Sequence, residues 1–105
     1  MILDVSFIIT VFNKRNELRA TIESLTRQTS SLHCEDIFVN DASTDDSMEV
    51  IKQIFGQAQN LTIVSNNHNS GPAIRLNQGC KIASGKYLCL IDLKLIFVRY
   101  FFVES

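Results

Sequence analysis

The stretch IFVNDASTDD, residues 37–46, joins a predicted strand to a predicted helix and decides the fold class. Ile37 to Val39 form an apolar, β-branched and aromatic run that is typical of a buried strand. Ser43, followed three positions later by Asp46, predicts a capping box at the start of a helix. Asp41 therefore lies at the carboxyl end of a strand, where ligands bind in open parallel sheets. An ordinary strand-to-helix turn, in which Asp41 and Ser43 only satisfy backbone donors, has the same local pattern.

The rest of the sequence repeats this order of strand and helix. Residues 5–11 form an almost continuous β-branched and aromatic run, typical of a strand that is covered on both faces. Residues 14–29 show helical spacing of apolar residues after a candidate N-cap at Asn13. A second helix ends near residues 56–60, and strands at 61–65 and 87–91 flank a helix that begins at Pro72. This alternation predicts an α/β fold with three layers, in which a Rossmann-like parallel sheet has helices on both faces and right-handed crossovers.

Length and charge restrict the possible classes of protein. A chain of 105 residues forms one domain with a single core. Its ten basic and eleven acidic residues are interspersed and give a net charge of -1, so no basic stripe is available and we expect no nucleic-acid partner. The three cysteines lack Cys-x-x-Cys spacing, which predicts free thiols in a reducing compartment. Because the first residues also lack the basic segment of a secretory signal, we expect a cytoplasmic location.

The carboxyl-terminal part is the candidate for contact with a membrane. Residues 88–103 are strongly apolar, but Asp92, Lys94 and Arg99 interrupt the run. The run is also shorter than the ~20 residues that a spanning helix needs. We therefore expect a soluble protein or one attached peripherally at the inner face of the membrane. Self-association through exposed sheet edges and the apolar tail is a further expectation.

Polar residues follow three of the predicted strands at the same edge of the sheet. They are Thr10 to Asn13 after the first strand, Asp41 after the second and Asp92 after the fourth. In a sheet of order 3-2-1-4 the switch point lies between the first and fourth strands, so one crevice can collect all three groups. Carboxylates with hydroxyl and amide groups suit a ribose, a base edge and a metal-bound diphosphate. The four glycines are too scattered for a dinucleotide or P-loop motif, which disfavours dinucleotide oxidoreductases and P-loop kinases.

Five segments carry, in order, a resemblance to a known family. They read VSFIITVFNK, RNELRATIESLTRQT, EDIFVNDASTDDS, NSGPAIRLNQG and ASGKYLCLID, and they extend from Val5 to Asp92. The set resembles the donor-binding half of inverting family-2 glycosyltransferases of the GT-A fold. The resemblance implies a partial nucleotide-sugar-binding domain over residues 1–92, followed by a divergent apolar tail over residues 93–105. It also implies that the domain binds a nucleotide-diphosphate sugar, UDP-linked, for transfer to an acceptor in polysaccharide, glycolipid or glycoprotein synthesis.

The same resemblance assigns roles to individual residues. It implies that Thr10, Phe12 and Asp41 hold the nucleotide base, with the Phe12 ring stacked on the base. Asn13 belongs to the same nucleotide-binding loop. Arg75 is assigned to the diphosphate or to the base. A core aromatic is the alternative for Phe12, and an exposed helical arginine is the alternative for Arg75.

The expected metal site departs from the family pattern. Asp92 corresponds to the beginning of the Asp-x-Asp motif, whose last carboxylate ligates the divalent cation, Mn²⁺ or Mg²⁺, that bridges the donor phosphates. Lys94 occupies that last position. A protonated ammonium has no lone pair and repels a cation, so Asp92 is the one metal ligand that the resemblance leaves. Residues 95–105 do not resemble the family, and no general base for the acceptor is recognisable. We therefore expect the 105-residue chain alone to be inactive in sugar transfer.

Two other functions fit parts of the sequence. A truncated, non-catalytic module would keep the fold and the base site and would act through nucleotide binding or through association with a complete partner. A receiver-type phosphoacceptor domain would need an acidic pair after the first strand. This chain has Val11-Phe12-Asn13-Lys14 at that place, which disfavours the receiver.

Overall fold

One mixed sheet forms the centre of the computed structural model, which describes residues 3–29, 33–55, 60–91, 93 and 100–104. Within these residues the strands are β1 (Val5–Val11), β2 (Cys34–Asn40), β3 (Leu61–Ser65), β4 (Tyr87–Ile91) and β5 (Tyr100–Glu104). Their order is β3-β2-β1-β4-β5. The first four strands pair in parallel, and β5 pairs antiparallel to β4. The predicted order 3-2-1-4 is confirmed, whereas β5 was not predicted.

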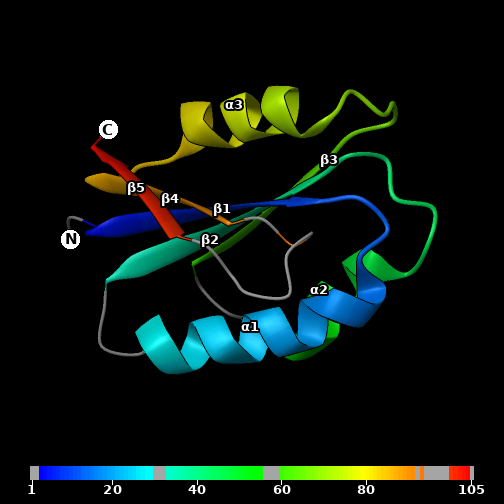
Figure 1. The fold of residues 1–105 in the computed structure, drawn as a ribbon, viewed down its shortest axis with the longest axis horizontal. Coiled ribbons are helices and arrows are strands. Elements are labelled where there is room, and N and C mark those ends of the chain that lie inside the picture. The colour runs from blue at the N-terminus through cyan, green and yellow to red at the C-terminus, as the bar shows by residue number, and fades with distance from the viewer. Residues whose placement is uncertain (1–2, 30–32, 56–59, 92, 94–99, 105) are drawn as a thin grey trace.

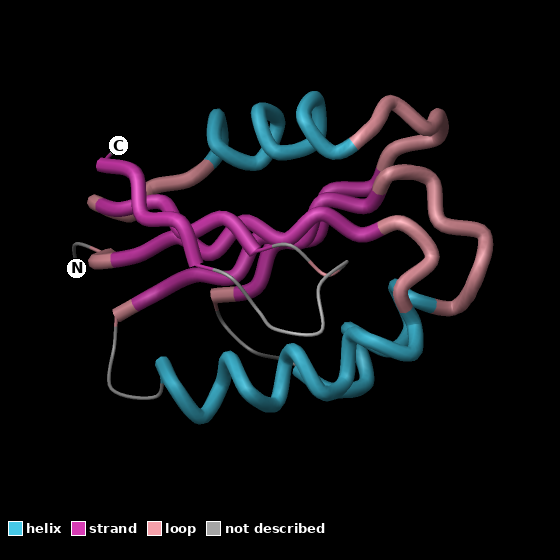
Figure 2. The backbone as a smooth tube through the Cα atoms, in the orientation of Figure 1, coloured by secondary structure: helices cyan, strands magenta, loops and turns pink. Residues whose placement is uncertain are grey.

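Helices cover both faces of this sheet. Helix α1 (Arg15–Thr29) and helix α2 (Ser47–Phe55) lie on one face, and helix α3 (Pro72–Ile82) lies on the other, as Figures 1 and 2 show. The predicted three-layer α/β architecture is therefore confirmed. Pro72 occupies the first turn of α3, as predicted, where its missing N–H removes no helical hydrogen bond.

The side chains of β1 divide between the two layers of the core. Alternate residues Val5, Phe7, Ile9 and Val11 pack toward α1 and α2, in one cluster with Leu18, Ile22 and Ile51. Ile8 points to the opposite face, where it packs with Ile37, Val39 and residues of α3. The run 5–11 is buried at every position except Thr10, which is half-buried. Successive side chains of β1 thus alternate between the two faces of the sheet, and both faces of the strand are apolar. This is typical of a strand at the centre of a sheet that is covered on both faces.

Two glycines allow α3 and the turn after it to approach β1 closely. A Cβ on Gly79 would lie 2.5 Å from Cγ2 of Ile8, and a Cβ on Gly85 would lie 2.6 Å from the backbone nitrogen of Ser6. The N–H of Gly85 donates to Oγ of Ser6 at 2.8 Å. These contacts fix the distance between α3 and the sheet, and with it the position of the first turn of α3 at the carboxyl edge.

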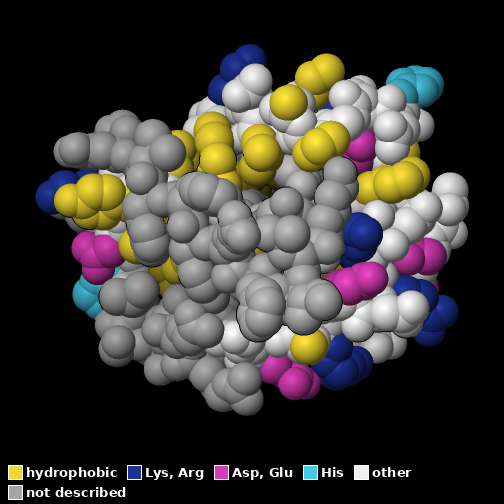
Figure 3. Space-filling model, in the orientation of Figure 1, with side chains coloured by type: hydrophobic (Ala, Val, Ile, Leu, Met, Phe, Trp, Pro, Cys, Tyr) yellow, Lys and Arg dark blue, Asp and Glu magenta, His cyan; other side chains and the backbone are white. Residues whose placement is uncertain are grey.

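Apolar side chains gather on the surface around α3 (Figure 3). Ile74 and Ile82 on this helix and Tyr87 at the start of β4 are among the exposed large hydrophobic residues. None of the helices in the described part of the chain combines the length and the apolar composition needed to cross a bilayer.

Candidate functional site

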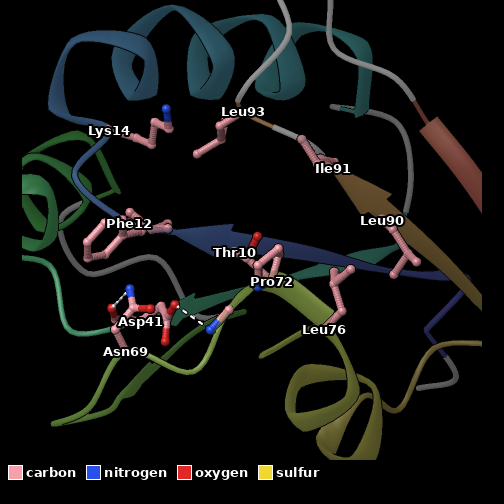
Figure 4. A pocket seen from close by; sticks show the side chains of 12 residues that line it. Thr10, Phe12, Lys14, Asp41, Asn69, Pro72, Leu76, Leu90, Ile91 and Leu93 are labelled. Atoms are coloured by element: carbon pink, nitrogen blue, oxygen red, sulfur yellow. Dashed lines mark hydrogen bonds between the residues drawn. The ribbon is translucent and has the colours of Figure 1, made fainter. Parts of the chain in front are cut away.

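A cavity of about 510 Å³ lies at the carboxyl ends of β1, β2 and β4 (Figure 4). Its lining comes from the ends of these strands, from the loop before α3 and from α3 itself; it comprises Thr10, Val11, Phe12, Lys14, Asp41, Asn69, Gly71, Pro72, Leu76, Leu90, Ile91 and Leu93. Its volume is typical of a small-molecule site, and its lining is mostly apolar with a few polar groups. The predicted crevice at this edge is thus present, and it includes Thr10, Phe12 and Asp41.

Asp41 is buried, with 4% of its surface exposed, and its carboxylate is held by three donors. Oδ1 accepts hydrogen bonds from the N–H of Ser70 at 2.7 Å and from Nε of Arg75 at 2.8 Å. Oδ2 accepts one from the N–H of Gly71 at 3.0 Å. Burial raises the pKa of Asp41, but the hydrogen bonds from Ser70, Arg75 and Gly71 and the positive charge of Arg75 outweigh it and leave the pKa below its ordinary value. Asp41 is therefore an ionised group that only accepts hydrogen bonds at neutral pH.

The loop before α3 is shaped to surround this carboxylate. Gly71 has φ 90°, a left-handed conformation that favours glycine. At this turn the backbone N–H groups of Ser70 and Gly71 both point at Asp41. Asn69 adds a hydrogen bond from Nδ2 to the backbone carbonyl of Asp41 at 3.5 Å. The loop that the sequence predicted from composition alone thus holds the carboxylate of Asp41 in the cavity wall.

Arg75 is buried, so the alternative of an exposed helical arginine is wrong. Its guanidinium forms the ion pair with Asp41 and also donates from Nη2 to the carbonyl of His68 and to Oγ of Ser70. A buried arginine needs such partners because the cost of removing its charge from water is large. Arg75 is absent from the cavity lining, but it contacts Asp41, which is part of that lining.

Phe12 projects from the end of β1 into the cavity and is 44% exposed, so the alternative of a core aromatic is wrong (Figure 4). A large exposed aromatic ring in a cavity offers a face on which a planar group can stack. Thr10, which is half-buried, contributes a hydroxyl to the same wall.

Lys14 also lines the cavity, and the sequence interpretation missed it. Its side chain is half-buried, and its ammonium forms no ion pair or hydrogen bond with any residue that the structure describes. A signal was present in the sequence, because a positive charge beside the start of a helix is unfavourable for the helix dipole. Lys14 directly precedes α1, so its positive charge does not stabilise that helix. Its presence there therefore indicates a role other than helix stability.

Asn13 joins the two loops at this edge, and its predicted role as a side-chain N-cap of α1 is wrong. Its Oδ1 accepts hydrogen bonds from the N–H groups of Thr44 at 2.8 Å and Asp45 at 3.1 Å, and its own N–H donates to Oγ of Ser43 at 3.1 Å. Asn13 has φ 52°, which turns its side chain toward the loop after β2. Its part in nucleotide binding stays a prediction.

The capping box predicted at Ser43 and Asp46 is also wrong, because α2 begins at Ser47. The N–H of Ser47 donates to Oδ1 of Asp45 at 2.9 Å, and Oγ of Ser47 accepts a hydrogen bond from the N–H of Lys14 at 3.0 Å. Donors at the beginning of α1 are thus satisfied by the segment at the beginning of α2, whereas the first N–H of α2 is satisfied by Asp45 of its own loop. This exchange holds the two loops together around the cavity.

The predicted metal ligand Asp92 and the neighbouring Lys94 lie outside the described residues, so their roles stay predictions. Within the described residues, no group of three or more His, Cys, Asp or Glu side chains could hold a metal ion. Asp41, the carboxylate in the described lining, already accepts three hydrogen bonds and does not fit the role of a free metal ligand.

Comparisons with known proteins agree with this fold. The chain is 35% identical, over 88 residues, to the UDP-Glc:alpha-D-GlcNAc-diphosphoundecaprenol beta-1,3-glucosyltransferase WfaP of Escherichia coli; the match covers 84% of this chain and 34% of that protein. The fold resembles that of Staphylococcus aureus TarS 1-349 in complex with UDP-GlcNAc, with a TM-score of 0.77 and 24% identity over 87% of this chain and 26% of that one.

The mannosyltransferase PcManGT of Pyrobaculum calidifontis, in complex with GDP-Man and Mn²⁺, has the same fold, with a TM-score of 0.78 and 20% identity over 89% of this chain and 28% of that one. The chain thus spans about a third or less of the length of these proteins. The family model described as Glycosyl transferase family 2 matches residues 6–96. With most of its length matched, this chain belongs to glycosyltransferase family 2.

Proposed function

We propose that the chain binds the nucleotide of a nucleotide-diphosphate sugar, with uracil as the base, and so provides the donor site of a glycosyl transfer reaction. The observation that carries this proposal is the ionised carboxylate of Asp41 in the cavity wall, beside the exposed ring of Phe12. The ring stacks on the base, and the carboxylate accepts a hydrogen bond from the base edge. TarS with UDP-GlcNAc and WfaP, which is named for UDP-Glc, support a uridine donor.

The hydrogen bonds already made by Asp41 favour uracil over the purines. Oδ1 accepts two donors and Oδ2 accepts one, so one of the roughly four acceptor positions of the carboxylate remains. Uracil has a single N–H, at N3, on the edge that it presents to a protein. Guanine presents two adjacent N–H donors, at N1 and N2, which need two acceptor positions. Adenine presents its amino donor, N6, at the side of this edge, with the acceptor N1 at the centre, where uracil has its N–H. One remaining acceptor position that faces the centre of the base edge therefore matches uracil best.

The diphosphate lies, in this proposal, on the side of the cavity where Lys14 projects (Figure 4). A lysine ammonium is a suitable point charge for a phosphate oxygen. The family implies a divalent cation, and PcManGT was solved with Mn²⁺. Asp92 is the residue of this chain that we assign to such a cation, which when bound would neutralise charge on the leaving diphosphate.

We propose that the donor sugar goes to an acceptor of polysaccharide, glycolipid or glycoprotein synthesis, beside the inner face of a membrane. WfaP, whose name specifies a diphosphoundecaprenol acceptor, supports a lipid-linked substrate. The three cysteines lie in unrelated sequence contexts without Cys-x-x-Cys spacing, which supports a reducing, cytoplasmic compartment. Inversion needs a general base for the acceptor hydroxyl, and the carboxylate in the described lining is already paired. We therefore assign donor binding, without transfer, to these 105 residues.

Calorimetric titration with UDP, GDP and ADP tests the proposal. We expect UDP to bind most tightly, and we expect Asp41→Asn to weaken UDP binding by about 1.5–3 kcal/mol, because a charge-assisted hydrogen bond is lost. Asp46→Asn is the matched control, since Asp46 is an exposed aspartate outside the cavity lining. Equal affinity for the three nucleotides, or no loss in Asp41→Asn, would show that this assignment is wrong.

A further inference from the structure

A pair of amide side chains lies behind Asp41, outside the cavity lining. Asn66, which follows β3, and Gln78, on α3, hydrogen bond to each other in both directions. Nδ2 of Asn66 donates to Oε1 of Gln78 at 2.9 Å, and Nε2 of Gln78 donates to Oδ1 of Asn66 at 3.1 Å. Nδ2 of Asn66 also donates to the backbone carbonyl of Asn40 at 2.9 Å. The pair thus connects α3 and the end of β3 to the residue that precedes Asp41.

Arg75 determines the direction of these hydrogen bonds. Nη1 of Arg75 donates to Oε1 of Gln78 at 3.3 Å, and the two residues are three positions apart on α3. Because a guanidinium only donates, the atom of Gln78 that faces it must be the amide oxygen. The amide nitrogen of Gln78 is then left for Oδ1 of Asn66, and the amide nitrogen of Asn66 for the carbonyl of Asn40. Each hydrogen bond follows from the one before it.

The guanidinium of Arg75 contacts Asp41 through one oxygen, although its geometry permits two. An arginine fork commonly pairs with both oxygens of a carboxylate. Here Nε donates to Oδ1, while Nη2 is held by the carbonyl of His68 and by Oγ of Ser70, and Nη1 is held by Gln78. Nη2, which lies on the same side of the guanidinium as the N–H of Nε and could reach Oδ2, is thus held by His68 and Ser70 instead. Oδ2 therefore retains an acceptor position.

We propose that Gln78, supported by Asn66, is a positioning residue for base recognition. It holds Nη1 of Arg75 and so fixes the plane of the guanidinium, which keeps Nη2 on His68 and Ser70 and away from the acceptor position of Asp41 that the base needs. This inference rests on the proposed function. Gln78 lines no part of the cavity and acts through Arg75 and Asp41.

Gln78→Met tests the role, because methionine keeps the length of the side chain and removes both hydrogen-bonding groups. Gln78→Glu keeps an acceptor for Nη1 of Arg75 and is the conservative variant. Gln53→Met is the matched control, since Gln53 is an exposed glutamine on α2. Affinities for UDP and ADP are measured by calorimetry for each variant and for the unmodified chain. The ¹³C shift of the Asp41 carboxyl group reports its pairing with Arg75 without any nucleotide.

We expect Gln78→Met to weaken UDP binding by about 3–10-fold, the usual effect of one hydrogen bond, while ADP binding stays unchanged. The UDP:ADP affinity ratio therefore falls, and the ¹³C shift of Asp41 moves. Gln78→Glu and Gln53→Met should keep both quantities near those of the unmodified chain. A general loss of stability would not change the ratio in folded protein, so the ratio distinguishes positioning from a structural role.

Two results would overturn the positioning role but not the proposed function. The first is an unchanged UDP:ADP affinity ratio in Gln78→Met when the unmodified chain prefers UDP. The second is an equal fall of this ratio in Gln78→Met and Gln78→Glu. If Gln78→Met does not fold, Asn66→Ala replaces it, because this variant removes the hydrogen-bond partner of Gln78. We expect Asn66→Ala to lower the UDP:ADP affinity ratio by a smaller factor. An unchanged ratio in Asn66→Ala contradicts the positioning role. If the unmodified chain does not prefer UDP, the proposed function fails, whatever the ¹³C shift shows about the pairing.

Discussion

At the scale of single residues, Asp41 and Arg75 form the buried ion pair around which the site is arranged. The sequence predicted the place of Asp41, because a carboxylate after a central strand of a parallel sheet falls at the ligand edge. It did not predict the partner, which is 34 positions away and has no local pattern connected with it. Arginine is seldom buried unless it is paired, so the burial of Arg75 could be recognised only from the folded chain.

The pair predicts a large loss of stability in Arg75→Ala. Removing the guanidinium leaves the carboxylate of Asp41 buried without its counter-charge, which typically costs about 3–5 kcal/mol. Arg15→Ala is the control, because the ion pair of Arg15 with Asp46 is exposed, and exposed pairs contribute about 0–1 kcal/mol. Urea unfolding of both variants measures the difference. Equal free energies of unfolding would contradict the structural role of the buried pair.

At the scale of elements, the strands and helices follow from hydrophobic periodicity, whereas their ends do not. The apolar runs at residues 5–11 and 61–65 became β1 and β3 as predicted. The helix starts were misjudged at Asn13 and Ser43 because these two side chains accept hydrogen bonds from the other loop, about 30 positions away in the sequence. Strand β5 lies in the apolar tail, which has no alternation that would separate a strand from a membrane-associated segment.

At the opposite end of β2, Asp36 makes stability depend on pH. Burial, with a further contribution from the negative charge of Glu35, raises its pKa to about 6, and its Oδ1 is buried without a hydrogen-bond partner within the described residues. Because the folded pKa exceeds the unfolded value, the folded state binds the extra proton between about pH 4 and pH 6. The contribution of Asp36 to the free energy of unfolding is therefore most favourable at low pH, and it is lost as the pH rises through about 6.

Asp36→Asn should therefore raise the free energy of unfolding at pH 7.5. Each pKa unit corresponds to about 1.4 kcal/mol, so a shift of roughly two units limits the gain to about 3 kcal/mol. At pH 4 the difference between the variant and the unmodified chain should almost vanish. Glu23→Gln, at an exposed carboxylate of α1, should show no such dependence. Urea unfolding between pH 4 and 8 measures the profile, and a gain at pH 4 equal to that at pH 7.5 would contradict the explanation.

At the scale of the whole molecule, the parallel order 3-2-1-4 brings the ends of β1, β2 and β4 to one cavity. This convergence was predicted, because the switch point of an open sheet follows from strand order. The polar network behind the cavity was not, since Asn66, Gln78 and Arg75 interact through side-chain geometry that no spacing rule describes. Thr10, Phe12 and Asp41, which we propose as donor-site residues, line the same cavity, and Asp92 lies outside the described residues.

The composition of the metal motif leads to a prediction for the whole chain. UDP binding should change little on addition of Mn²⁺ or Mg²⁺, because Lys94 replaces a metal-binding carboxylate, and no sugar transfer should be measurable. Lys94→Asp should introduce metal-dependent binding without transfer, whereas Lys81→Asp, the same charge change on an exposed residue of α3, should not. Calorimetry with and without metal separates these effects. Metal-stimulated sugar transfer by the unmodified chain would contradict this prediction.

The most direct test of the donor site is a ¹H–¹⁵N NMR titration of the 105-residue chain with UDP. If the base binds between Phe12 and Asp41, the largest shift changes should fall on the amides of Thr10, Phe12, Asp41 and Gly71, and they should be much smaller with ADP. The amides of Glu35 and Ser84, which meet at the opposite edge of the sheet, should stay unchanged. Saturable changes confined to that opposite edge, or no saturable change with UDP, would contradict the account.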